Sequence, residues 1–416
     1  MTRGRDAKPQ TTSEGGSDRL LVLIVVALAT IGAALGLAMI RGENESERIR
    51  ANGSAPNTAS PTAGSPTTTS PGGTKKGPAS ITLAFAGDLL PHTAVNDRAR
   101  EYGAESSRAY DFAPMLAPMK AIISGADVAI CHMEVSVAPL GEATSSYPAF
   151  GAPAELVDGA KSAGYDGCSN ASNHSLDRGR AGIEATLDRF DQNGLRHSGI
   201  ARTAAEGAAI TMYDAKGVKV AHLSYAYGFN GYEIPAGAPW AVDQIAPGRI
   251  KADAAAARAA GADLVVVSLH WGTEYDSAPS QYQRDIASQI LPSADIDLVI
   301  GSHAHVVQPI GQVGGTYVVW GMGNQLSNMT QDARRDGITV RATAARNAAG
   351  HWQVSGVEAI ATWVELGSFR VLPVVDTLAN PKTPAGLRSE LSGSYDRTAA
   401  IVMGVPAPGV IMAPKP

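Results

Sequence analysis

The sequence has little cysteine, no excess of positive charge and none of three common catalytic motifs. Two cysteines among 416 residues exclude a disulfide-dense scaffold and a zinc site made of four cysteines. Lys and Arg total 34 against 39 Asp and Glu, which argues against a nucleic-acid partner, because nucleic-acid-binding proteins carry a basic face. The G-x-x-x-x-G-K phosphate loop, the G-x-S-x-G elbow and the H-E-x-x-H helix are missing, so the sequence supports none of these site types.

One long hydrophobic run lies near the start of the chain. The 21 residues from Leu20 to Ile40 contain no charge and no proline, and about 20 helical residues cross a hydrocarbon layer of ~30 Å. A cleaved secretory signal is the alternative, because Gly36-x-Ala38 is a weak small-residue cleavage site, but signal cores usually run about 7–15 residues. We therefore interpret residues 20–40 as a transmembrane anchor and residues 1–19 as a cytoplasmic tail.

The segment after this run has the composition of a spacer. From Ala51 to Ser80, 21 of 30 residues are Pro, Ser, Thr or Gly, too few apolar side chains to offset the entropy cost of ordering. We expect residues 41–80 to be a disordered linker that holds an exported domain away from a surface. The expected protein is thus a single-pass protein of the cell membrane with its main domain outside the cytoplasm.

Short apolar runs alternate with helical patterns from Ile81 onward, which predicts an α/β domain over residues 81–376. Strand, helix, strand at this spacing indicates a mostly parallel sheet with helices on its faces. The predicted strands are Ile81–Ala86, Asp127–Cys131, Gly167–Asn170, Val218–Tyr225, Leu264–Leu269, Leu298–Gly301 and Tyr317–Trp320. The predicted helices are Ala113–Ser124, Ala154–Ala163, Gly179–Gln192, Arg249–Ala259 and Gln281–Leu291.

The pattern changes after Gly337. Residues 337–342, 352–364 and 369–375 are typical of a strand-only meander. From Asn380 onward Pro and Gly return without periodicity. Residues 377–416 are therefore expected to form an irregular C-terminal tail.

Polar side chains follow one predicted strand after another. In parallel α/β sheets the carboxyl ends of the strands share an edge, and ligands bind beyond it, so these residues should converge. Each has an ordinary alternative role, such as a helix cap for Asp88 or a buried core histidine for His270. The set is stronger than its members, because five of nine histidines fall at or just beyond strand ends. The candidate residues are Asp88, Glu134, Asn173, His174, His270, His303 and His305.

This combination of residue types predicts a metal site. Carboxylate, amide and imidazole ligands without a thiolate suit Mn²⁺, Fe²⁺ or Zn²⁺. Asp88 or Glu134 is placed to bridge two such divalent ions, which would activate a water as the nucleophile. His174 would then donate a proton to the leaving group. Cys131 and Cys168 lie on predicted strands near the site, either as buried thiols or as one disulfide.

Six motifs follow one another along the ordered part of the chain. They are Phe85-Ala-Gly-Asp88, Glu134, Ala171-Ser-Asn-His174-Ser-Leu-Asp177-x-Gly179, His270-Trp-Gly-Thr-Glu274, Gly301-Ser-His-Ala-His305-Val-Val-Gln-Pro309 and Gly321-Met-Gly-Asn324. In this order they resemble the CapA/PgsA poly-γ-glutamate capsule family, and the likeness covers residues 81 to 375. That family is similar in turn to calcineurin-like metallophosphoesterases, which implies a four-layer α/β/β/α sandwich around two metal ions.

The resemblance also implies roles for the residues. Asp88, Asn173, His270, His303 and His305 resemble metal ligands, Glu134 resembles the bridging carboxylate, and His174 resembles the proton donor. The sequence departs from the pattern at several places, and Ser302 stands where the His-His-x-His run has its second histidine. Leu90 stands where D-x-H has its histidine, with His92 two residues later, and the usual Asn-Leu-Glu is His132-Met133-Glu134.

Three functions remain open at this point. The first is a membrane-anchored protein of capsule synthesis or export, which acts on an anionic polymer together with capsule-synthesis membrane proteins. The second is an extracytoplasmic, metal-dependent phosphoesterase acting on a small or lipid-linked phosphate. The third is a polymer-binding module without catalytic activity, against which the surviving ligand set argues.

Overall fold

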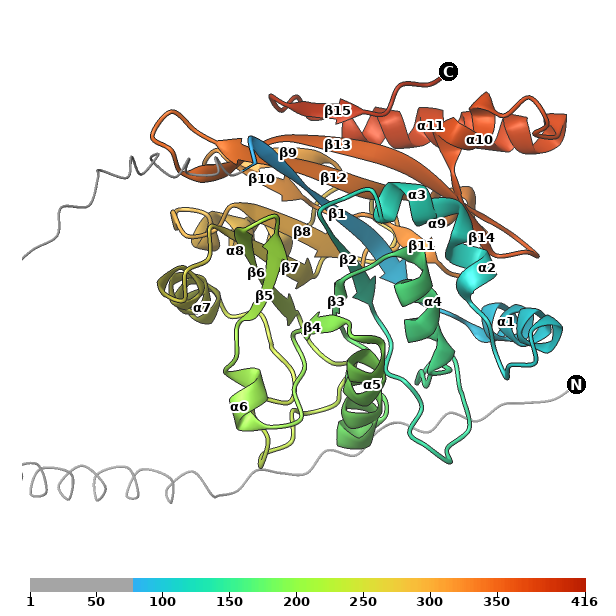
Figure 1. Cartoon of the computed structure of the whole chain (residues 1–416), viewed down its shortest axis with the longest axis horizontal. Helices are drawn as coiled ribbons and strands as arrows, with labels where there is room; N and C mark the ends of the chain where they lie inside the picture. Colours follow the sequence, from blue (N-terminus) through green and yellow to red (C-terminus); the bar gives the residue numbers. More distant parts are fainter. Residues whose placement is uncertain (1–77) are drawn as a thin grey trace, which may run out of the picture. The chain divides into compact units, whose positions relative to one another are not determined.

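Two β-sheets organise the described part of the chain. The structure, a computed structural model, describes residues 78–416, so the predicted tail, anchor and nearly all of the linker lie outside the described residues. Within residues 78–416, no helix is long and apolar enough to cross a membrane. Figure 1 shows the two sheets facing each other, with helices on their outer sides.

The first sheet has nine strands, in the order β14-β13-β12-β1-β2-β3-β4, with β11 beside β1 and β15 beside β13. Strands β1 to β4 run parallel, whereas β12, β13 and β14 form an antiparallel meander that joins the sheet through β1. The strands are β1 Ser80–Leu89, β2 Val128–Met133, β3 Gly167–Ser169, β4 Arg196–Ser198, β11 Asn324–Leu326, β12 Asp336–Arg346, β13 Trp352–Glu365, β14 Arg370–Pro373 and β15 Val410–Met412.

The second sheet has six strands, in the order β5-β6-β7-β8-β10-β9. Its central strands β6, β7, β8 and β10 are parallel, and the two edge strands are antiparallel to their neighbours. The strands are β5 Thr211–Ala215, β6 Val218–Ala226, β7 Leu264–His270, β8 Leu298–Ser302, β9 Ile310–Val313 and β10 Thr316–Val319. The predicted mostly parallel sheet is thus two mixed sheets, and all seven strands predicted before Gly337 exist.

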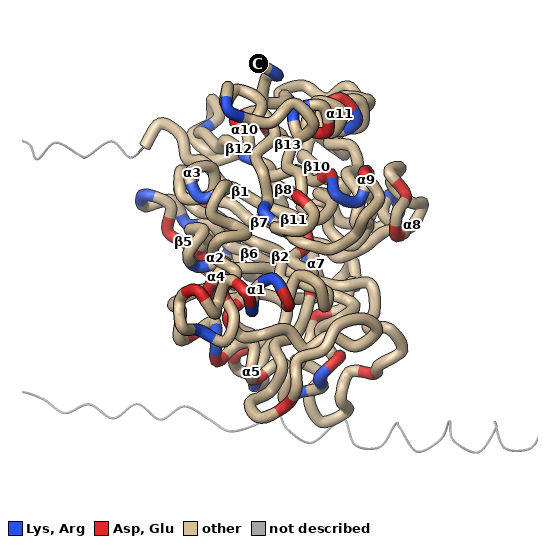
Figure 2. The backbone as a smooth tube through the Cα atoms, turned by 90° about the vertical axis from the view of Figure 1, so that its right-hand side faces the viewer, with Lys and Arg blue, Asp and Glu red and all other residues tan. Residues whose placement is uncertain are grey.

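The helices are α1 Thr93–Glu105, α2 Ala113–Leu116, the 3₁₀ helix η1 Ala117–Met119, α3 Lys120–Ile123, α4 Glu155–Ala163, α5 Gly179–Asn193, α6 Ala204–Gly207, α7 Pro247–Ala259, α8 Gln281–Ile290, α9 Asp332–Arg335, α10 Val374–Ala379 and α11 Ala385–Val402. The predicted helix over 113–124 is broken into the three short pieces α2, η1 and α3. Pro114 and Pro118 lie in the first turn of the first two pieces, and Pro118 interrupts the helix because proline has no N–H for the preceding turn. In Figure 2 charges of both signs are mixed along α1 and α11.

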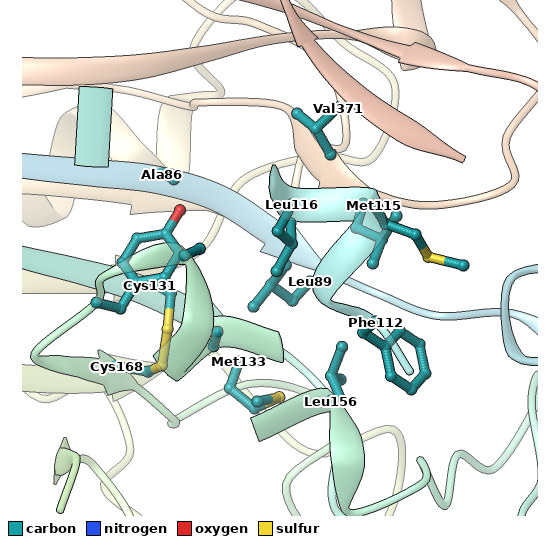
Figure 3. Close-up of a cluster of buried hydrophobic side chains, with 14 of the residues drawn as sticks. Ala86, Leu89, Phe112, Met115, Leu116, Cys131, Met133, Leu156, Cys168 and Val371 are labelled. Carbon is teal, nitrogen blue, oxygen red and sulfur yellow. A yellow bond between two sulfur atoms is a disulfide. The ribbon is translucent and has the colours of Figure 1, made fainter. Parts of the chain in front are cut away.

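Three hydrophobic layers hold these elements together. One lies between the first sheet and helices α1 to α4, a second between the sheets, and a third between the second sheet and helices α7 and α8. Figure 3 shows part of the first layer, with Cys131 and Cys168 on one side, Phe112 on the other and Leu89 and Leu116 between them. A disulfide joins the two cysteines, which are paired residues of the neighbouring strands β2 and β3. The order of layers is therefore helix, sheet, sheet, helix.

The C-terminal region differs from the irregular tail that we expected. Helix α11 spans Ala385–Val402, and β15 pairs with β13. The buried positions of α11 are Leu391, Ser394, Thr398 and Val402, at the spacing of one helix face. Two of these four side chains are polar, so the apolar periodicity that predicts a helix is missing from the sequence.

A tight crossing connects the sheets beside the strand ends. The backbone after β10 passes Gly301 of the second sheet and Gly87 of the first, where Met322 N donates to Gly301 O and Asp88 N donates to Gly323 O. A Cβ on Gly87 would lie 1.9 Å from Gly323 O, and one on Gly301 would lie 1.9 Å from Trp320 O. Both positions therefore require glycine, and the crossing fixes the backbone of Asp88.

Candidate metal centre

The seven predicted site residues come from both sheets and are all buried. Asp88 lies on β1, and Glu134 directly follows β2. Asn173 and His174 lie in the loop after β3, His270 ends β7, and His303 and His305 follow β8. The strand ends meet at one place, as the topology predicts.

Four groups of donor atoms are close enough to hold a metal ion. Within each group one donor atom per residue lies within 4.8 Å of the others. The groups are Asp88 with His132 and His270, Glu134 with His270 and His303, Glu274 with His303 and His305, and Asp88 with Glu134 and His305. Asn173 adds an amide oxygen, since its Oδ1 lies 2.7 Å from His270 Nε2.

Two carboxylates lie at the centre of the cluster. Asp88 Oδ2 is 3.1 Å from His305 Nδ1 and accepts a hydrogen bond from His303 N. Glu134 Oε1 is 3.6 Å from His305 Nε2 and 3.9 Å from His270 Nε2. Glu134 thus reaches the histidines of both β7 and β8, as a bridging ligand must.

Several donor atoms in this cluster have no protein partner. Both carboxylate oxygens of Glu134, Asp88 Oδ1 and His303 Nδ1 are buried without a hydrogen bond. A buried carboxylate without partners is strongly destabilising, and buried polar groups are normally satisfied. Because these four atoms are ligand types for divalent transition metals, the residues fit such an ion.

The electrostatics of the cluster lead to the same conclusion. Burial raises the pKa of Glu134 well above its usual value. The attraction of His305 lowers this pKa in part, whereas the repulsion of Asp88 raises it further. Burial opposes the charging of His305, but Glu134 and Asp88 raise its pKa to about 9. Burial and the charge of His305 lower the pKa of His303 to about 3. The cluster by itself has too little positive charge for two ionised carboxylates, and a divalent cation would supply it.

The backbone at two histidines adopts an uncommon conformation. His303 has φ 93° and His305 has φ 55°, in the left-handed region that side chains other than glycine seldom occupy. Such strain persists where the surroundings enforce it and is concentrated at functional sites. The turn after β8 therefore directs both imidazoles into the cluster.

His174 lies beside the cluster with a carboxylate behind it. Its Nδ1 is 2.6 Å from Asp177 Oδ2, and Phe150 N donates to that same oxygen. A carboxylate on Nδ1 fixes the orientation of an imidazole and leaves Nε2 for chemistry. The geometry thus suits the proton donor role that the sequence predicts.

Two residues of the cluster were absent from the predicted ligand set. His132 is buried, with its Nε2 2.9 Å from His270 Nδ1, and the exposed Glu274 approaches His303 and His305. The signal for His132 was its place at a strand end, two residues before Glu134. The neighbouring candidate His92 lies before α1 and belongs to none of the four groups among the described residues, so it does not replace the histidine absent at Leu90.

Comparison with known proteins places this chain in a family. The family model described as bacterial capsule synthesis protein PGA_cap matches residues 82–329. The chain belongs to this family. The capsule-family resemblance seen in the motifs is thereby confirmed.

Two relatives of this chain come from Bacillus species. The chain is 28% identical over 211 residues to the PGA biosynthesis protein CapA of Bacillus subtilis (strain 168). This alignment covers 49% of this chain and 53% of that protein. The chain is also 28% identical over 197 residues to the capsule biosynthesis protein CapA of Bacillus anthracis, with 45% and 46% covered. The chain thus matches about half the length of these curated relatives.

Among solved structures, a similar one is the calcineurin-like phosphoesterase YfkN from Bacillus subtilis. The sequence identity is 13% and the TM-score is 0.43, over 77% of this chain and 96% of that chain.

Proposed function

We propose that this chain is a membrane-anchored protein of capsule synthesis or export whose outer domain uses a metallophosphatase-like site with two divalent transition metal ions. The observation that carries the proposal is Glu134, fully buried, with two unpartnered oxygens beside imidazoles from both sheets. Family membership supports the capsule role. The disulfide between Cys131 and Cys168 supports an exported domain, because disulfides persist in oxidising compartments.

Different residues of this chain would have different roles in hydrolysis. Asp88, Glu134, Asn173, His270, His303 and His305 would hold the ions. The ions would supply Lewis acidity beside the bond to be broken. His174, oriented by Asp177, would donate a proton from Nε2 to the leaving oxygen.

The rim of the site favours an anionic substrate. The guanidinium of Arg334 lies 3.5 Å from the ring centroid of Tyr275, and that ring is 6.0 Å from His305. Among the ion pairs of residues 78–416, none involves Arg334, whereas the adjacent Arg335 pairs with Asp332 and Glu390. A cation without a protein counter-ion beside the metal ligands would attract a phosphate or a polymer carboxylate.

This arrangement gives a prediction for Arg334. Arg334→Ala should raise KM for an anionic substrate about 10-fold, because one charge-assisted hydrogen bond of ~1.5 kcal/mol is lost. The kcat should change little, since Arg334 is not among the ligands. Steady-state kinetics on a phosphodiester will measure both, with Arg335→Ala as the control for loss of a neighbouring arginine. An unchanged KM would show that Arg334 does not contact the substrate.

The anchor gives a second prediction. Deletion of Leu20–Ile40 should move the protein from the membrane fraction to the soluble fraction, because the longest apolar run of the sequence is removed. Fractionation and immunoblotting will test this. Persistent membrane association would mean that another part of the chain attaches to the membrane.

The capsule role itself is tested in the host cell. Loss of the gene should reduce surface anionic polymer, and the wild-type chain should restore it, whereas the Asp88→Ala variant should not. Restoration by Asp88→Ala would favour a polymer-binding module. Normal polymer in the deletion strain, together with turnover of a generic phosphodiester by the purified protein with Mn²⁺, would favour a phosphoesterase outside capsule synthesis.

A further inference from the structure

His132 is connected to both sheets by a continuous chain of side chains. Its Nδ1 is 2.8 Å from Ser169 Oγ, and its Nε2 is 2.9 Å from His270 Nδ1. His270 Nε2 in turn lies 2.7 Å from Asn173 Oδ1. All four side chains are buried, so water does not compete for these contacts.

The ends of this chain decide which atoms carry hydrogens. Asn173 Nδ2 donates to Asn230 Oδ1 at 3.2 Å, so the amide presents its oxygen, an acceptor only, to His270 Nε2. His132 Nε2 and His270 Nδ1 lie 2.9 Å apart, so one of these two nitrogens carries the hydrogen and the other accepts it. The hydrogen bond between the two imidazoles can therefore run in two directions, and His270 Nδ1 has a second contact with Ser302 Oγ at 3.1 Å.

In the first direction every contact is satisfied without a metal ion. Ser169 Oγ–H donates to His132 Nδ1, His132 Nε2–H donates to His270 Nδ1, and His270 Nε2–H donates to Asn173 Oδ1. In the second direction His132 Nδ1–H donates to Ser169 Oγ, whose own hydrogen points to Cys131 O at 3.3 Å. His270 Nδ1–H then donates to His132 Nε2.

The second direction leaves two electron pairs facing each other. His270 Nε2 and Asn173 Oδ1 are then both acceptors, 2.7 Å apart, and a cation bound to both removes the repulsion. The same two atoms are the metal-facing donors of their residues, since His270 Nε2 is the nitrogen closer to Glu134. The second direction is therefore the ligating state of His270.

We propose that His132 is a positioning residue for the metal centre: Ser169 and His132 hold His270 in the tautomer that ligates through Nε2, and metal loading reverses the direction of the hydrogen-bond chain. The inference rests on the metal site proposed above. It gives a role to the histidine that replaces the asparagine of the usual Asn-Leu-Glu motif. Partners behind a histidine ligand fix its tautomer and are worth about 10–100-fold in metal affinity.

The test measures Zn²⁺ affinity of the full-length protein by competition with a chelating dye, and the visible absorption of the Co²⁺-loaded protein. His132→Leu should weaken Zn²⁺ binding about 10–100-fold. His132→Gln places an amide where His132 Nε2 lies and should recover most of that loss, whereas His132→Asn reaches only the Nδ1 position and should not. The Co²⁺ spectrum of the saturated variants should match that of the parent, because His132 does not contact the ion.

The matched control is His222→Leu. His222 is also a buried histidine with a serine partner, Ser268, but lies on β6 outside the four donor groups found among residues 78–416. This variant should keep the parent affinity, which separates the loss of His132 from the loss of any buried imidazole.

Any other result contradicts either the metal site or the positioning role of His132. A parent that binds neither Zn²⁺ nor Co²⁺ overturns the metal site itself. A parent that binds metal, with His132→Leu equal to it, overturns only the positioning role. Equal affinity of the Gln and Asn variants also overturns it, and so does a Co²⁺ spectrum changed in all His132 variants, since His132 would then be a direct ligand. If His132→Leu does not fold, the comparison of Gln with Asn still decides.

Discussion

The double variant Asp88→Ala/His303→Ala should contain no bound transition metal, whereas the parent should bind two ions. Each of the four donor groups in the described residues includes Asp88 or His303, so no complete group survives the pair of substitutions. Losing one ligand typically costs much of a site's affinity, and losing one from every group leaves at most two protein donors in each. Elemental analysis after dialysis against metal-free buffer measures the stoichiometry.

The matched control for this variant is Asp97→Ala/His351→Ala. Both residues are exposed and lie outside the four groups. Their substitution removes one aspartate and one histidine, as the double variant does. The control should retain the parent's metal content and its circular dichroism spectrum. Equal metal content in the double variant and the parent would contradict the assignment of Asp88 and His303 as ligands.

The His174→Ala variant should keep its metal but lose turnover by about 10²–10⁴-fold, the usual contribution of general acid catalysis. The imidazole belongs to none of the donor groups of residues 78–416, and it is held by Asp177 beside them. The loss should be smallest for substrates with good leaving groups, which need no proton. Rates with a nitrophenyl ester and with an alkyl ester, compared in parent and variant, measure this difference.

A second variant separates orientation from proton transfer. Asp177→Asn keeps the size of the side chain and removes the charge that orients His174, so its loss of turnover should be smaller than that of His174→Ala. Full turnover of His174→Ala on the alkyl ester would mean that another group donates the proton.

Much of the parallel architecture follows from the sequence, because buried strands of four to nine residues give continuous apolar runs. The strands β6, β7 and β8 are of this kind. Polar residues at their ends then locate the site, since parallel strands end at a common edge. For this reason all seven candidate residues lie together in the structure.

The elements that the sequence did not reveal have little or interrupted apolar patterning. Strands β4 and β11 contain three residues each, and helix α11 buries Ser394 and Thr398 on its inner face. The strand pattern alone did not separate the second sheet from the first, because each consists of the same strand and helix alternation, and only the family resemblance implied two sheets. His132 was missed for a different reason. Its contact with His270 joins residues 138 positions apart, and only the packing of the two sheets creates it.

The division of the metal ligands between the two sheets has a consequence for the stability of this domain. Asp88 and Glu134 belong to the first sheet, and His270, His303 and His305 to the second, so an ion held by both sets would fasten one sheet to the other. Binding to the native state alone contributes RT ln(1 + [L]/Kd) to the free energy of unfolding, ~4 kcal/mol at a thousandfold excess over Kd. A chelator would then lower the melting temperature of the domain.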